Sequence, residues 1–153
     1  MKPQQTFIQQ IAPAAVASFA KTGIFPSAVI AQAAFESDWG RKAPGNNLYG
    51  IRADSKWKGM TVRFATHEKI DGVLKLVEGT FRAYASWEAS MIDHAGFFHD
   101  NPRYENALKC TTGPNFCMAI AKAGYATGAD YGEALRAMIR DHDMTQFDGK
   151  AAA

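Results

Sequence analysis

The stretch AQAAFESDWG, residues 31–40, joins an apolar segment to a carboxylate and a tryptophan. Residues 27–37 are rich in alanine, a composition typical of a buried helix, and Glu36 is the only acid among them. We expect Trp39, three residues further on, to share a helix face with Glu36. A carboxyl group desolvated against apolar surface has a raised pKa and can act as a general acid near neutral pH. The alternative from these residues alone is an exposed glutamate at a helix end, with Trp39 in the core.

Helical segments flank this stretch, and a hairpin follows it. Residues 41–60 are interrupted by proline, glycine and asparagine, which predicts a loop. Residues 61–84 alternate or carry β-branched and aromatic side chains, and Asp71–Gly72 is a strong signal for a hairpin turn. Further helices are predicted at residues 4–21, 86–99, 103–109, 114–123 and 130–141, with Thr112 or Asn115, and Asp130, as candidate caps.

This order of elements predicts one α+β domain. A chain of 153 residues fits a single compact unit. The helices would form most of the body, with a small antiparallel β-hairpin flap over a cleft. We place the domain at residues 1–148 and expect GKAAA, residues 149–153, to form a disordered tail.

Glu68 is the second acid of interest, in the segment ATHEKIDG just before the predicted turn. A flap could bring it over the cleft to face Glu36. Glycosidases generally place two carboxylates on either side of the sugar bond, one acid and one base or nucleophile. The alternative is a surface residue beside a turn.

Composition excludes several classes of function. The net charge is +2 with a pI of about 8.5, and there is no clustered basic stripe of the kind that nucleic-acid binding requires. No run approaches the ~20 apolar residues of a membrane span, and the N-terminus lacks the apolar core of a signal peptide. We therefore expect no nucleic-acid partner and no membrane insertion.

Metal and nucleophile motifs are likewise missing from the sequence. The four histidines are scattered and no HExxH motif occurs, so we expect no metal and no cofactor. Cys110 and Cys117 flank a Gly-Pro loop and could form a local disulfide, although two reduced thiols are slightly favoured. A cysteine or serine nucleophile is disfavoured, because nothing marks either side chain as activated.

Several stretches together resemble a known family, the peptidoglycan-cleaving glucosaminidases of glycoside hydrolase family 73. The resemblance covers about residues 4–141 and rests on seven segments in order, AQAAFESDWG, NNLYGIRA, WKG, THEKIDG, FRAYASW, NPRY and AGYATGADYGEAL. It implies a lysozyme-like fold and hydrolysis of a β-1,4 glycosidic bond in peptidoglycan glycan strands.

The resemblance also assigns site residues. The essential acid of the family motif ALES-x-WG matches Glu36, and the second acid, in a T-x-E motif, matches Glu68. The tyrosine of the GYATDP-x-Y motif matches Tyr125, although this chain reads GYATGAD and so lacks the proline. The expected catalytic residues are therefore Glu36, Glu68 and Tyr125. The expected substrate-binding residues are Trp39, Asn47, Tyr49, Tyr84 and Tyr131.

The function expected from this resemblance is an endo-β-N-acetylglucosaminidase that acts as a monomer on peptidoglycan. The alternatives are an N-acetylmuramidase, a lytic transglycosylase or a wall-binding module without catalysis. A phage endolysin or a secreted lytic effector fits such a chain. We expect it to be made in the cytoplasm and to act on the bacterial cell wall in the periplasm by an unknown export route.

Overall fold

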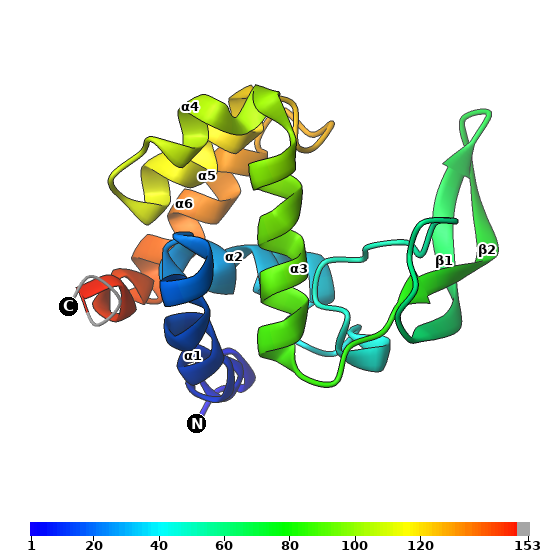
Figure 1. The fold of residues 1–153 in the computed structure, drawn as a ribbon, viewed down its shortest axis with the longest axis horizontal. Coiled ribbons are helices and arrows are strands. Elements are labelled where there is room, and N and C mark those ends of the chain that lie inside the picture. Colours follow the sequence, from blue (N-terminus) through cyan, green and yellow to red (C-terminus); the bar gives the residue numbers. More distant parts are fainter. Residues whose placement is uncertain (150–153) are drawn as a thin grey trace.

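The computed structural model describes residues 1–149 and consists of a helical body with a β-hairpin at one side (Figure 1). Residues 150–153 of the expected tail lie outside the described part, whereas Gly149 lies within it. The α-helices are α1 (Pro3–Thr22), α2 (Pro26–Ser37), α3 (Trp87–Asp100), α4 (Glu105–Leu108), α5 (Gly113–Lys122) and α6 (Tyr131–Asp141). The strands are β1 (Thr61–Ile70) and β2 (Val73–Arg82), and short 3-10 turns are η1 (Pro44–Asn46), η2 (Pro102–Tyr104) and η3 (Met144–Phe147).

Helix α2 is the centre of the body. Ten of its 12 residues are buried, and it packs on α1, α5, α6 and η3. Its alanines let these neighbours approach closely, which is why an alanine-rich segment can occupy the core. The helix begins at Pro26, where a proline loses no hydrogen bond. It ends at Ser37, because Asp38 and Trp39 adopt left-handed conformations with φ of 51° and 59°.

The hairpin has the predicted position and turn. Ile70 pairs with Val73 across Asp71 and Gly72, whose φ values of 50° and 78° suit a two-residue hairpin turn. The base of the hairpin is held by backbone hydrogen bonds to the loop after α2, including Tyr84 N to Gly45 O at 2.8 Å. The ribbon extends beside the helical body and not into it (Figure 1).

The structure differs from the predicted helices at one segment and shows which candidate residues cap the others. The helix predicted at 103–109 is instead the 3-10 turn η2 followed by the single turn α4. Thr112, not Asn115, caps α5, because its Oγ1 accepts a hydrogen bond from Asn115 N at 3.3 Å. Asp130 occupies the N-cap position of α6 as predicted, although its side chain makes no capping hydrogen bond to the described residues.

Both cysteines are free thiols, as the slightly favoured interpretation expected. Cys110 donates to Asn106 O at 3.7 Å, while Cys117 is buried in α5. Each helix within residues 1–149 is too short or too polar to cross a bilayer.

Candidate active site

Glu36 lies in the last turn of α2, where its Oε1 accepts a hydrogen bond from Tyr131 Oη at 3.1 Å. The Phe35 ring packs edge-on against the Tyr131 ring, with centroids 5.1 Å apart. Solvent still reaches Glu36, yet protein crowds its carboxyl group, and this desolvation raises its pKa above the ordinary value. The hydrogen bond from Tyr131 opposes the shift without cancelling it. Glu36 therefore has the environment of a general acid that remains open to a ligand.

Tyr125 and Tyr131 stack on each other beside Glu36, with ring centroids 5.4 Å apart and an interplanar angle of 25°. Burial raises the pKa of both phenols, and the negative charge of Glu36 raises it further. Both hydroxyls are therefore protonated at neutral pH and available as hydrogen-bond donors. The loss of the family's proline from GYATGAD has not removed either tyrosine from the site.

His94, on α3, belongs to the same cluster. Its Nε2 lies 2.8 Å from Tyr125 Oη, and its ring stacks on Tyr49 at 3.8 Å with an interplanar angle of 7°. Burial lowers the pKa of His94 to about 3, so the imidazole is neutral at working pH. Sequence reasoning missed His94, because nothing in its local sequence distinguishes it from the other three histidines.

Gln32 is the second residue that sequence reasoning missed. Its side chain is 1% exposed, and its Nε2 donates to Tyr131 Oη at 3.1 Å. The signal was present in the sequence, because Gln32 precedes Glu36 by four residues and so lies on the same face of the helix.

A cavity of about 480 Å³ adjoins this cluster. Tyr49, His94 and Tyr125 line one side of it, and Arg82 at the base of the hairpin lines another. The cavity therefore adjoins both the helical cluster and the base of the hairpin, although Glu36 and Tyr131 themselves are not part of its lining.

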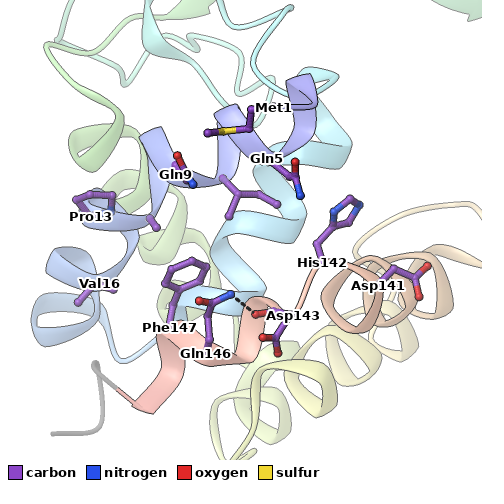
Figure 2. A pocket seen from close by; sticks show the side chains of 12 residues that line it. Met1, Gln5, Gln9, Pro13, Val16, Asp141, His142, Asp143, Gln146 and Phe147 are labelled. Carbon is purple, nitrogen blue, oxygen red and sulfur yellow. Dashed lines mark hydrogen bonds between the residues drawn. The ribbon is translucent and has the colours of Figure 1, made fainter.

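A larger cavity of about 940 Å³ lies elsewhere, between α1 and the segment from the end of α6 to η3 (Figure 2). Gln5, Val16, His142 and Phe147 are among its lining residues. Glu36, Glu68 and the expected substrate-binding residues are not part of this lining. The larger cavity is thus not the one that the expected site residues line.

Glu68 lies on β1, and its carboxylate forms an ion pair with Arg52. The Arg52 guanidinium lies over the Phe81 ring at 4.9 Å, and a Cβ at Gly79 would come within 2.7 Å of Arg52 Nη1. The glycine in β2 therefore makes room for the arginine that holds Glu68.

The two acids have different partners, Tyr131 for Glu36 and Arg52 for Glu68. The hairpin that carries Glu68 extends beside the body (Figure 1). The pairing of the two carboxylates across a sugar therefore stays a prediction.

Trp39 does not share a helix face with Glu36, which corrects the sequence prediction. Because the chain turns left-handed after Ser37, the indole packs edge-on against Phe7 at 6.0 Å and against His142 at 5.0 Å. The aromatic ring that contacts the carboxyl of Glu36 is that of Tyr131. Trp39 thus packs the α2 turn against α1 and the end of α6, instead of flanking the acid.

Asn47 lies in the loop below the hairpin. Its Nδ2 donates to Ile51 O and to Arg82 O, both at 2.8 Å. Its Oδ1 accepts from Tyr49 N and from Ile51 N. Both hydrogens and both lone pairs of the amide are therefore engaged within the protein, and the role of Asn47 in substrate binding stays a prediction. Asn47 ties the loop to β2.

Tyr84 and Tyr49, also expected to bind substrate, are both buried. Tyr84 donates to Asp93 Oδ2 at 2.6 Å and so fixes the base of the hairpin to α3. Tyr49 donates to Val29 O at 3.2 Å but lines the cavity beside Tyr125. Of the expected aromatic contacts, Tyr49 and Tyr131 lie in the cluster around Glu36, and Tyr84 does not. Direct contact of Tyr49, Tyr84 or Tyr131 with substrate stays a prediction.

The chain matches a known family over most of its length. The glucosaminidase family model, described as mannosyl-glycoprotein endo-beta-N-acetylglucosaminidase, matches residues 12–144. The chain therefore belongs to the glucosaminidase family, glycoside hydrolase family 73, and its lysozyme-like α+β fold is confirmed. Among residues 1–149, no cluster of three histidine, cysteine, aspartate or glutamate side chains could hold a metal ion.

Individual proteins of this family are similar over most of the chain. The exo-glucosaminidase LytG of Bacillus subtilis is 33% identical over 95% of this chain and 54% of its own length. A probable N-acetylmuramidase of Lactococcus lactis is 33% identical over 97% of this chain and 36% of its own. The chain thus spans about half the length, or less, of these relatives. The glycoside hydrolase domain of Salmonella typhimurium FlgJ superposes with a TM-score of 0.79 at 29% identity, covering 92% of this chain and 97% of that one.

Proposed function

We propose that the protein is a peptidoglycan hydrolase that cleaves a β-1,4 glycosidic bond of the glycan strands as an endo-β-N-acetylglucosaminidase. The observation that carries this proposal is Glu36, an acid with a raised pKa that receives a hydrogen bond from Tyr131. Tyr131 stacks on Tyr125, which lines a cavity. Membership of the glucosaminidase family supports the reaction class. The relative FlgJ, named a peptidoglycan hydrolase, supports the substrate, and LytG, named an exo-glucosaminidase, supports cleavage at a glucosamine unit.

In this mechanism Glu36 protonates the glycosidic oxygen as the bond to the leaving sugar breaks. The raised pKa keeps a larger share of Glu36 protonated at neutral pH than an ordinary glutamate would be. As the proton leaves, the hydrogen bond from Tyr131 stabilises the carboxylate that forms. Glu36 therefore stays protonated before the reaction, and its carboxylate is stabilised once the proton has been transferred.

The opposite side of the sugar needs a base for water, or a group that stabilises the developing positive charge. Glu68 is the candidate, because its ion pair with Arg52 holds a carboxylate on the hairpin. Tyr125 is the candidate for positioning the N-acetyl group of the substrate. Its hydroxyl is fixed by neutral His94, which holds it at the edge of the cavity.

Replacement of the acid tests the proposed function. Glu36→Gln should lower the lysis of purified cell walls by about 10²–10⁴-fold, since the amide cannot donate a proton to the leaving group. Turbidity loss of a wall suspension measures the rate, and circular dichroism checks the fold. Glu105→Gln is the matched control, because the Glu105 side chain is exposed on α4 and pairs with Lys109, and it should retain normal lysis. Near-normal lysis by Glu36→Gln would overturn the assignment.

A second candidate is an N-acetylmuramidase, which the Lactococcus lactis relative favours by its name. Mass spectrometry of the released muropeptides separates the possibilities. Reducing-end N-acetylglucosamine supports the glucosaminidase. Reducing-end N-acetylmuramic acid supports the muramidase, and anhydro-muramyl ends would indicate a lytic transglycosylase.

The biological setting that fits this activity is the bacterial cell wall, reached from the cytoplasm by an export or release route. A phage endolysin and a secreted lytic effector are the two settings proposed, with the enzyme acting as a monomer. Light scattering of the purified protein tests the monomer, and the neighbouring genes distinguish the two settings.

A further inference from the structure

Three side chains form a line from the buried face of α2 to the acid. Gln32 Nε2 lies 3.1 Å from Tyr131 Oη, and Tyr131 Oη lies 3.1 Å from Glu36 Oε1. Gln32 is 1% exposed, whereas Glu36 is accessible to solvent. The polar chain therefore has a buried end and an open end, with the reacting carboxyl at the open end.

The direction of the two hydrogen bonds follows from the ionised form of Glu36. A carboxylate only accepts, so the hydroxyl hydrogen of Tyr131 must point at Glu36 Oε1. The Tyr131 oxygen then needs a donor behind it, and the Gln32 amide nitrogen supplies one. Successive hydrogen bonds polarise one another, so a donor on Tyr131 makes Tyr131 a stronger donor to the carboxylate.

The burial of Gln32 is otherwise hard to explain by packing. Its Oε1 is buried and has no hydrogen-bond partner among residues 1–149. Buried polar atoms usually have a partner, and an apolar side chain of the same length would fill this position without leaving one unpaired. The protein has an amide at this position although its oxygen is buried without a partner. This indicates that the hydrogen bond from Gln32 Nε2 to Tyr131 Oη has a function.

We propose that Gln32 is a positioning residue for the acid, which acts through Tyr131 to stabilise the carboxylate that Glu36 becomes when it gives up its proton. This inference rests on the proposed function, in which Glu36 is the general acid. It adds a requirement for a hydrogen-bond donor at the buried end of the chain.

The groups around Glu36 allow the effect of Gln32 on its carboxylate to be measured without a change in neighbouring charge. The titratable groups that face its carboxyl are the phenols of Tyr49, Tyr125 and Tyr131, from the loop after α2, the loop before α6 and α6 itself. All three are neutral at working pH, because burial raises the pKa of each. Gln32 interacts with the phenol of Tyr125 as well as with that of Tyr131, but only Tyr131 donates a hydrogen bond to Glu36. A change at Gln32 should therefore reach Glu36 mainly through the Tyr131 hydroxyl and not through a change in nearby charge.

The test is Gln32→Met, which keeps an unbranched side chain of similar size and removes the amide. Titration of the Glu36 carboxyl carbon by NMR of the labelled free enzyme should show a midpoint raised by roughly 0.5–1 pH unit, since the charged form loses support. With soluble glycan strands, kcat should fall about tenfold with KM nearly unchanged, and the alkaline limb of the pH profile should move upward.

Two further variants complete the design. Gln10→Met removes an exposed glutamine from α1 and should change neither the midpoint nor kcat. Tyr131→Phe combined with Gln32→Met should titrate like Tyr131→Phe alone, because Gln32 acts through that hydroxyl.

An unchanged or lowered Glu36 midpoint in folded Gln32→Met would overturn the proposal, and so would additive effects in the double variant. The NMR midpoint does not depend on turnover. Failure of this inference is therefore distinguishable from failure of the proposed function, which would show as normal lysis by Glu36→Gln.

Discussion

The two acids of this protein lie in opposite kinds of surroundings. Glu36 ends a buried helix and contacts an aromatic cluster whose members come from α3, α6 and two loops. Glu68 lies on a two-stranded ribbon and is held by one arginine from a neighbouring loop. The comparison teaches that packing sets the protonation behaviour of the first acid, while a single ion pair fixes the position of the second.

Stability should separate the two regions most strongly. Leu135→Ala in α6 should cost about 2–5 kcal/mol of unfolding free energy, because Leu135 is fully buried and leaves a cavity. The same change at Leu76 on β2 should stay within about 0.5 kcal/mol, since that side chain is 65% exposed. Urea unfolding of both variants measures the difference. Equal costs would mean that the hairpin is packed as tightly as the body.

A substitution at Glu68 on the hairpin should lower activity without lowering the stability of the protein. Glu68→Gln should lower the rate of wall lysis by about 10²-fold if Glu68 serves as base or charge stabiliser. Lysis of purified walls, with urea unfolding in parallel, measures both properties. Near-normal lysis would reduce Glu68 to a binding residue.

Arg52→Met sharpens this test, because it removes the ion-pair partner of Glu68 but keeps the Glu68 carboxylate itself. A smaller loss, about tenfold, is expected for this variant. In the double variant with Glu68→Gln, the loss at Arg52 should disappear. A full additional loss would show that Arg52 acts on the substrate by itself.

The smallest effect concerns pH and stability at Glu36. Its raised pKa means that Glu36 contributes stability below the ordinary glutamate pKa, and that this contribution is lost as pH rises through the raised value. Glu36→Gln should therefore gain Tm relative to the wild type between pH 4 and pH 7, by roughly 1–3 °C. Thermal melts at both pH values measure it, with Glu105→Gln as the control. A difference that is the same at both pH values would contradict the raised pKa.

The hairpin and α2 show which features of the fold can be predicted from local sequence. Asp71–Gly72 fixed the turn because these residues tolerate left-handed backbone, and that requirement is purely local. The alanine-rich run predicted α2 for a similar reason. The expectation that Trp39 shares a helix face with Glu36 was wrong, because the helix stops at Ser37. The Ser37 hydroxyl donates to Ala33 O and accepts from Gly40 N, and periodicity does not reveal this side-chain arrangement.

The sequence by itself determined the order of elements and the family, and it singled out Glu36 as the candidate acid, because helix periodicity, turn chemistry and motif spacing are all local properties of the chain. Only the tertiary structure decided what surrounds Glu36. Tyr131 lies 95 positions from Glu36 in the chain, and His94 reaches Tyr125 from another helix. The tertiary structure also packs Trp39 against Phe7 of α1, and it engages the Asn47 side chain in hydrogen bonds to the backbone of its own loop and of β2. Contacts between distant segments depend on how the helices pack, and no local pattern specifies that.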